Sequence, residues 1–333
     1  MTVSGAATST REASPARRTL LLAGATGFVG GAVLPALQAR GWHIRGLTRN
    51  AGGRAQMPGL EWVQGDVGDA GASARALDGC DAALYLVHGI GAGADYHRRE
   101  VHAAGIFAQA AAAAGVERVV YLGGVAPQGA GSEHLRSRLE VGAALRAAVR
   151  TVELRASMIV GAGSLSWLIV RDLAARLPVM VLPRWLKSRT EPVAIDDVVV
   201  ALARALEMPL AASEWFDVPG PEVLSGKQIL NETARVLGLA PPHTLDVPLL
   251  TPRLSSLWVR FVTRADWTIA REIVVGLAED LLARDDRFWQ LIDHPRRQSF
   301  ATAASRALDA ERQAGPVRGA WGFVERRRRP ERT

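Results

Sequence analysis

The sequence predicts an α/β fold in which a parallel sheet is covered by helices on both faces. Short apolar segments of strand length alternate with segments of helical period from residue 19 to residue 156, and this alternation is typical of parallel strands joined by helical crossovers. The segment 81–87 is almost continuously apolar, as expected of a strand that is buried on both faces. Three regularly spaced glycines follow the first of these strands.

These glycines lie at positions 24, 27 and 30, after the apolar run 19–23 and directly before a helical pattern with Val29, Val33, Ala36 and Leu37 on one face. A helix N-terminus presents unpaired N–H groups and a partial positive charge. Glycines let the backbone turn sharply and approach a pyrophosphate closely. A strand, a glycine turn and a helix in this order predict a Rossmann-type dinucleotide-binding unit. The alternative is an ordinary strand-to-helix turn of another α/β protein.

A second strand is expected at 42–49, and its end bears on the choice of dinucleotide. NAD-selective folds place an acidic residue about 20 residues after the glycines, where it binds the ribose 2′-hydroxyl. This chain offers Thr48, Arg49 and Asn50 there, and an arginine can instead pair with a 2′-phosphate. We therefore expect NADP(H) rather than NAD(H), with Arg49 at the 2′-phosphate. The alternative is a solvated arginine at a strand end.

The first half continues with the same alternation. Strands are expected at 60–66, 81–87, 119–124 and 151–156, and helices at 70–77, 96–114 and 132–150. Asp66 and Val67 would meet an adenine ring at the carboxyl edge of the sheet, and the loop that begins at His88 would lie near the nicotinamide ribose. Ser132 is the expected N-cap of its helix.

The second half departs from this rhythm. Helices are expected at 165–177, 225–237 and 251–282, extended segments at 179–183 and 215–220, and at 191–198 a strand that turns into a helix capped by Asp196. We expect a disordered leader at 1–18, the Rossmann domain at 19–160 with 190–220 returning to it, a smaller, mainly helical substrate region at 161–189 and 221–315, and a basic tail at 316–333. The aromatic residues Trp258, Phe261 and Trp267 are expected in the core rather than in the wall of a substrate pocket.

Composition argues against several classes of protein. The single cysteine, Cys80, excludes an internal disulfide and a thiolate cluster, and the seven histidines contain no i, i+4 pair, so no metal is expected. No uncharged apolar stretch reaches the about 18 residues of a membrane helix, and we expect a cytoplasmic protein. The net charge of +7 comes from arginine, since Lys187 and Lys227 are the only lysines. The arginine-rich tail is expected to be solvated; nucleic acid or an anionic membrane is the alternative, but no recognition module accompanies it.

Four segments together resemble the atypical and extended short-chain dehydrogenase/reductase superfamily, and within it the NmrA-like and epimerase-like NAD(P)H-binding branch: 24–30, 65–66, 121–124 and 191–198. The resemblance covers roughly residues 19 to 300 and implies hydride transfer to or from a small organic substrate. It further implies four sets of contacts with the dinucleotide. Arg49 would bind the 2′-phosphate and Asp66 and Val67 the adenine. The pyrophosphate would be lined by Gly24, Thr26, Gly27, Phe28, Val29 and Gly30, and the nicotinamide side by Leu86, Val87 and His88.

The sequence lacks the proton donor that is usual in this superfamily, a tyrosine followed four residues later by a lysine. None of the three tyrosines has such a lysine, and no lysine precedes Lys187. The matching helix instead carries His134 and Arg138 at this spacing, and Gly123 and Gly124 replace the usual serine.

His134 could act as a general acid, since the ordinary pKa of histidine lies close to physiological pH, and Arg138 could bind the ribose. The alternative for His134 is a solvated or capping residue. Tyr96 and Tyr121 are further candidate donors, but Tyr121 lies in a predicted buried strand and is expected in the core. Two functions remain open, namely an oxidoreductase or epimerase-like enzyme and a non-catalytic, NmrA-like redox sensor. The oligomeric state is left open.

Overall fold

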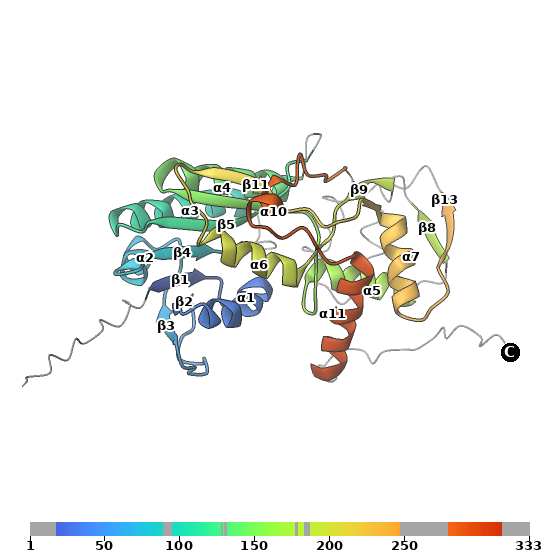
Figure 1. The fold of residues 1–333 in the computed structure, drawn as a ribbon, viewed down its shortest axis with the longest axis horizontal. Coiled ribbons are helices and arrows are strands. Elements are labelled where there is room, and N and C mark those ends of the chain that lie inside the picture. The colour runs from blue at the N-terminus through green and yellow to red at the C-terminus, as the bar shows by residue number, and fades with distance from the viewer. Residues whose placement is uncertain are drawn as a thin grey trace, which may run out of the picture.

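A seven-stranded parallel sheet forms the centre of the computed structural model, which describes residues 18–88, 95–127, 129, 132–176, 179–182, 187–246 and 279–314. The strand order is β11-β6-β5-β4-β1-β2-β3 (Figure 1), and every neighbouring pair is parallel. The strands are β1 (Thr19–Ala23), β2 (His43–Thr48), β3 (Leu60–Gln64), β4 (Ala82–Tyr85), β5 (Arg118–Gly124), β6 (Thr151–Ala156) and β11 (Glu214–Asp217).

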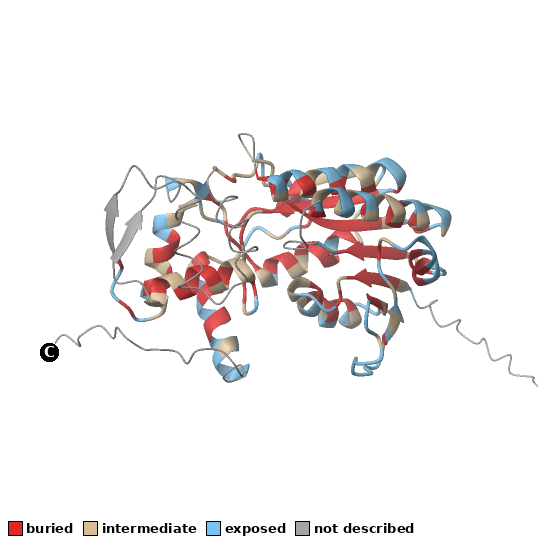
Figure 2. Cartoon of the chain, turned by 180° about the vertical axis from the view of Figure 1, so that it is seen from behind, coloured by how far each residue is buried: buried red, intermediate tan, exposed pale blue. Residues whose placement is uncertain are grey.

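Helices cover both faces of this sheet. One face carries α1 (Phe28–Ala39) and α6 (Ile195–Ala205), and the other carries α2 (Ala70–Leu77), α3 (Tyr96–Ala113) and α4 (Glu133–Ala148). Side chains of β1 alternate between the two cores: Leu20 packs with the α1 and α6 side, and Leu21 packs with the α2, α3 and α4 side. Figure 2 shows the buried strands between the two helical layers. The doubly wound, Rossmann-type parallel sheet predicted from the sequence is therefore confirmed.

The C-terminal part is smaller and mainly helical. The helices α5 (Leu165–Arg176), α7 (Gly226–Val236) and α11 (Phe300–Ala314) enclose a third core that includes Trp167, Leu230 and Phe300. Short strand pairs lie beside them: β7 (Ile159–Val160) with β10 (Val193–Ala194), β9 (Arg189–Thr190) with β12 (Leu224–Ser225), and β8 (Val179–Leu182) with β13 (His243–Asp246). The short helix α10 (Arg287–Leu291) returns to the sheet and adds Phe288 and Trp289 to the α1 and α6 core. None of the helices described is long and apolar enough to cross a bilayer.

The predicted helix caps have different outcomes. Ser132 does cap α4, because its hydroxyl accepts a hydrogen bond from the Leu135 amide at 3.3 Å. The cap at Asp196 is wrong, because β10 runs directly into α6 and Ala194 is the N-cap, without a side-chain bond. Asp196 lies in the first turn instead and pairs with Arg306 of α11 at 2.6 Å.

The neighbouring carboxylate also holds the C-terminal segment. Asp197 is buried and bonds to the ring of His294 at 2.9 Å and to the Gln298 amide at 2.8 Å. The predictions for the leader, for the helix with Trp258, Phe261 and Trp267 and for the basic tail fall largely or wholly outside the described residues. The predicted domain boundaries stay a prediction.

Candidate functional site

The carboxyl ends of β1, β4 and β5 meet at one edge of the sheet. The chain places β2 and β3 on one side of β1 and then crosses to β4 on its other side. In open α/β sheets such a reversal leaves a crevice beyond the carboxyl ends of the two central strands, and ligands bind there. Most residues that the sequence singled out come from the turns at this edge.

The glycine loop lies directly after β1 and has a backbone that only glycines accommodate. Gly24 has φ +92°, which disfavours any side chain. A Cβ on Gly30 would lie 2.1 Å from the carbonyl oxygen of Gly24, so the helix can approach the strand this closely only with glycine. Gly27 is the N-cap of α1 and makes no side-chain capping bond. The first N–H groups of α1 therefore remain available to an anion.

The other residues of the loop differ in what they present to the crevice. Thr26 and Gly27 are exposed, whereas Val29 is half-buried. The ring of Phe28 points away from the crevice toward Gly161, which follows β7, since a Cβ on Gly161 would lie 2.9 Å from the Cζ atom of Phe28. Phe28 can thus offer a phosphate its backbone N–H but not its side chain.

Two residues mark the expected adenosine end. Arg49 is exposed, one residue after β2, and has no ion pair or hydrogen bond within the described parts of the chain. Asp66 is exposed beyond the neighbouring β3, and its carboxylate accepts a hydrogen bond from the Gly68 amide at 2.9 Å. Val67 is buried. Both strands end at the same sheet edge, so this placement is compatible with a 2′-phosphate at Arg49 and an adenine near Asp66.

The exit of β4 packs against the glycine loop. A Cβ on Gly24 would lie 3.0 Å from the carbonyl carbon of Leu86. The ends of β1 and β4 are therefore in close contact. Val87 is half-buried, and His88 is exposed with its Nδ1 atom 3.3 Å from the carbonyl oxygen of Leu86. Desolvation lowers the pKa of His88, and the positive charge of Arg138 lowers it further.

Arg138 on α4 is fixed over the end of β5. Its Nη2 atom donates a hydrogen bond of 2.7 Å to the carbonyl oxygen of Leu122. A Cβ on Gly124 would lie 3.3 Å from the Cδ and Nε atoms of Arg138. The glycine that replaces the superfamily's serine therefore leaves the room that the guanidinium group occupies.

His134 lies one helical turn before Arg138 and is only partly exposed. Desolvation, then Arg138 and then His88 lower the pKa of His134 to about 3. The ring is thus neutral at physiological pH, and the argument that its ordinary pKa suits a general acid does not hold. Its Nδ1 atom is enclosed and has no hydrogen-bond partner among the described residues. The low pKa of His134 could not be predicted, because the sequence does not show how deeply the first turn of α4 is enclosed.

The two remaining tyrosine candidates are buried. Tyr121 donates its hydroxyl to the backbone carbonyl of Arg138 at 3.0 Å, and burial raises its pKa to about 12. The expectation that Tyr121 belongs to the core is therefore confirmed. Tyr96 lies in the first turn of α3 and is 7% exposed. Its role as a donor stays a prediction, as do the roles of His134 and Arg138.

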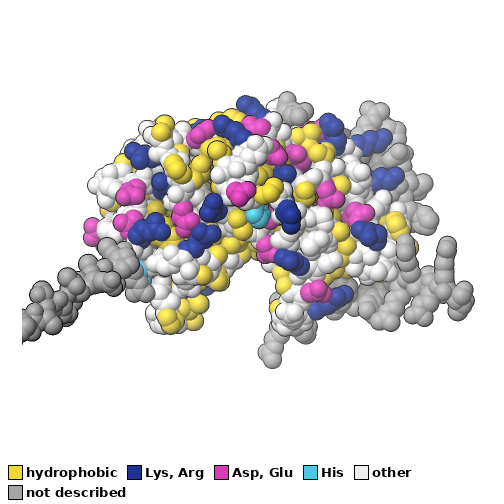
Figure 3. All heavy atoms as spheres, in the orientation of Figure 1, with side chains coloured by type: hydrophobic (Ala, Val, Ile, Leu, Met, Phe, Trp, Pro, Cys, Tyr) yellow, Lys and Arg dark blue, Asp and Glu magenta, His cyan; other side chains and the backbone are white. Residues whose placement is uncertain are grey.

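A cavity of about 420 Å³ lies between the start of α1, the start of α6 and α11. Figure 3 shows the hollow between the α1 side of the molecule and α11. Its lining is mainly apolar and comes from α1, α6 and α11 and from the ends of β7 and β10, with Asp196, Gln298 and Arg306 as the polar groups. No pattern in the sequence pointed to this cavity. Among the described residues, no group of three or more His, Cys, Asp or Glu side chains could hold a metal ion.

Comparison with known proteins identifies the domain that contains the glycine loop. Residues 24–175 match the NAD(P)H-binding family model. The chain carries an NAD(P)H-binding domain. The matched range begins directly after β1 and includes β2 to β6, the glycine loop and the His134–Arg138 turn. No curated protein sequence matches the chain.

Solved structures share the fold over most of the chain at low sequence identity. The enzyme WbmH of Bordetella bronchiseptica, solved with NAD+, is 17% identical with a TM-score of 0.67, covering 90% of this chain and 100% of its own. A nucleoside-diphosphate-sugar epimerase of Staphylococcus aureus is 13% identical with a TM-score of 0.68, covering 86% and 99%. The dTDP-glucose 4,6-dehydratase DesIV of Streptomyces venezuelae, a double mutant solved with NAD and DAU, is 20% identical with a TM-score of 0.66, covering 88% and 97%. The NAD(P)H-binding match and this shared fold are consistent with the resemblance to the extended and atypical short-chain dehydrogenases/reductases.

Proposed function

We propose that the NAD(P)H-binding domain serves an oxidoreductase or epimerase-like enzyme that moves a hydride to or from a small organic substrate. The observation that carries this proposal is the shared sheet edge. The uncapped N-terminus of α1, the exit of β4 and the His134–Arg138 turn all lie at the carboxyl ends of adjacent strands. A dinucleotide laid across this edge would have its phosphates at α1 and its nicotinamide near His88.

The residues present fit such a cofactor. The approach of Gly30 to Gly24 and the free N–H groups after Gly27 form a cradle that suits a pyrophosphate. When bound, the nicotinamide supplies the hydride chemistry, and the protein supplies binding and orientation. Exposed and unpaired within the described parts of the chain, Arg49 supports NADP(H) over NAD(H), because a guanidinium group binds a phosphate in a bidentate way.

The second candidate is a non-catalytic dinucleotide sensor of the NmrA-like kind. The observation that favours it is the environment of the tyrosines, since the hydroxyl of Tyr121 is bonded to the Arg138 carbonyl and Tyr96 is buried. Neither is placed as the superfamily's usual donor. A sensor would bind the dinucleotide at the same edge without turnover.

One experiment separates the two functions. NADPH and NADH are titrated into the purified protein by nicotinamide fluorescence, and NADPH oxidation is then followed with ketones, aldehydes, quinones, enones and nucleoside-diphosphate sugars. Binding with turnover of at least one substrate supports the enzyme. Tight binding without turnover across the panel would favour the sensor, and absence of binding would contradict both. A cytoplasmic location agrees with either function and is part of the proposal.

A further inference from the structure

We propose that His134 and Arg138 form an oxyanion-binding pair, and that the substrate is a conjugated carbonyl compound, an enone or a quinone. This inference rests on the proposed enzyme function and adds its substrate class. The pair lies on one face of α4, four residues apart, beside the end of β5. No group of the usual catalytic pair occupies this place, and the resemblance to the superfamily does not assign these two residues a role.

The positive charge of Arg138 is fixed and is not neutralised. Its guanidinium group donates to a neutral backbone carbonyl, that of Leu122. It forms no ion pair with any carboxylate in the described ranges. Glu100 is an acidic group whose charge acts on His88, and it accepts a hydrogen bond from the Ser137 hydroxyl. A guanidinium held in place without a counter-ion attracts negative charge that develops beside it.

His134 complements this charge as a neutral hydrogen-bond donor. Its Nδ1 atom is enclosed without a hydrogen-bond partner in the part of the chain that the structure describes. A buried N–H without an acceptor costs free energy, so the neutral ring is best accommodated with its proton on Nε2. Desolvation of the ring opposes its protonation, and so do the positive charge of Arg138 and the neighbouring ring of His88. A neutral imidazole can polarise a carbonyl oxygen without transferring its proton.

Among the side chains described at the end of β5, Arg138, His134 and Tyr121 therefore stabilise an oxyanion better than they protonate one. Arg138 stays protonated, His134 has no proton to release as an acid at neutral pH, and the Tyr121 hydroxyl is bonded to a backbone carbonyl. Reduction of a simple ketone gives an alkoxide that needs a proton from an acid in the site. A conjugated carbonyl avoids this need, because its negative charge is delocalised.

The step balances as a conjugate reduction. The β-carbon of the substrate accepts a hydride from the reduced nicotinamide, the electrons of the C=C bond move toward the carbonyl, and an enolate forms on the substrate oxygen. His134 Nε2–H and Arg138 bind this oxygen while the α-carbon takes a proton from water. The substrate is reduced by two electrons and the dinucleotide is oxidised by two.

The test uses an enolate analogue and needs no turnover. Para-nitrophenol is titrated into the NADP+-bound protein, and its absorbance reports the fraction bound as phenolate. We expect the apparent pKa of bound nitrophenol to fall below its value in buffer. The shift should be lost in Arg138→Gln and His134→Leu but largely retained in His134→Gln, which keeps an N–H donor. Arg136→Gln, an exposed residue on the same helix, is the matched control and should behave as the wild type.

A second readout concerns the ring itself. ¹⁵N NMR of the imidazole should show His134 as the neutral Nε2–H tautomer, without titration from pH 5 to pH 8. Any one of four results would overturn the inference. The protein could fail to bind nitrophenol, or the bound nitrophenol could be ionised equally in all variants. His134 could titrate near the ordinary pKa of histidine, or saturated ketones or sugar nucleotides could be turned over in preference to enones. A fluorescence titration with NADPH shows which proposal has failed. If the protein does not bind NADPH, the proposed function is contradicted. If it binds NADPH, only the oxyanion pair is contradicted.

Discussion

Arg138 occupies the space that a side chain at position 124 would need: a Cβ on Gly124 would lie 3.3 Å from its Cδ and Nε atoms. A serine at this position would press on the guanidinium group. The absence of a side chain at position 124 and the placement of Arg138 therefore depend on each other.

Gly124→Ser should displace the guanidinium group of Arg138 and lower turnover of the best substrate. A misplacement of this kind costs about tenfold to a hundredfold in rate, while NADPH affinity should change little because the phosphate cradle is remote. The measurement is kcat together with an NADPH fluorescence titration. Equal kcat in the variant and the wild type would show that Arg138 has no role in the reaction.

Gly30→Ala should destabilise the fold and weaken dinucleotide binding. The new methyl group would lie 2.1 Å from the carbonyl oxygen of Gly24, and overpacking of this kind costs about 1–3 kcal/mol or more. Gly31→Ala is the matched control, because nothing lies within 4 Å of its Cβ position. In a helix this change should be neutral or stabilise by up to about 1 kcal/mol. Urea unfolding and NADPH titration of both variants measure the contrast, and similar results for the two would contradict it.

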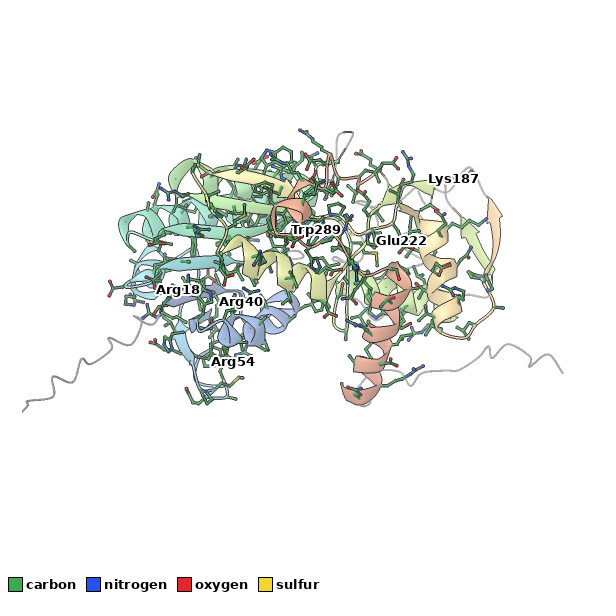
Figure 4. The ribbon with its side chains drawn as sticks, viewed as in Figure 1. Arg18, Arg40, Arg54, Lys187, Glu222 and Trp289 are labelled. Atoms are coloured by element: carbon green, nitrogen blue, oxygen red, sulfur yellow. The ribbon has the colours of Figure 1, made fainter. Side chains whose placement is uncertain are left out.

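Arg49→Gln should weaken the binding of NADPH far more than that of NADH. Hydrogen bonds to charged groups contribute about 1.5–3 kcal/mol, so the Kd for NADPH should rise by tenfold or more. Arg54→Gln is the control, since Arg54 lies on the loop after β2 with its Cζ atom 6.0 Å from the ring of Trp62 (Figure 4). Isothermal titration with both dinucleotides distinguishes the variants. Equal losses for NADPH and NADH would remove Arg49 from the 2′-phosphate.

His134 should make the fold less stable as the pH falls. Its pKa is about 3 in the folded protein and about 6.5 in the unfolded chain. Below about pH 6.5 the unfolded state binds a proton that the folded state does not bind. The free energy of unfolding therefore falls progressively between about pH 6.5 and pH 3. The contribution at pH 5 is about 2 kcal/mol.

His134→Gln should therefore reduce the fall in Tm between pH 7 and pH 5. The Tm difference between variant and wild type at pH 8, where both side chains are neutral, gives the baseline. An identical pH dependence of Tm in the two proteins would show that the ring is not desolvated. His88, whose pKa is lowered as well, should account for part of the remaining dependence.

Glu153→Gln should destabilise the central sheet. The Glu153 side chain is fully buried on β6 between Arg146 and Arg155, with the Nε atom of Arg155 at 2.7 Å. Removing one partner of a buried charge pair costs about 3–5 kcal/mol. Glu61→Gln is the control, because Glu61 pairs with Arg45 at 3.4 Å with its side chain 52% exposed, and exposed pairs contribute little. Guanidinium unfolding of both variants tests the difference; comparable losses would mean that Glu153 is solvated in solution.

Local patterns in the sequence determined the sheet, its helices and the glycine loop. Strand and helix formation depends on periodicities over a few residues. The spacing of Gly24, Gly27 and Gly30 directly indicates that α1 packs closely against β1. The incorrect cap at Asp196 shows the limit of this reasoning. Asp196 and Asp197 bond to Arg306, His294 and Gln298, about 100 residues further along the chain, and no local pattern predicts such partners.

The chemistry of the candidate site was decided by the tertiary structure alone. From the sequence, His134 and Arg138 were two residues at a helical spacing, and histidine had its ordinary pKa. Packing of α4 over the end of β5 encloses the ring of His134, lowers its pKa and places the guanidinium group of Arg138 against Gly124. Desolvation and charge act through space, and only the folded chain determines which groups lie within their range.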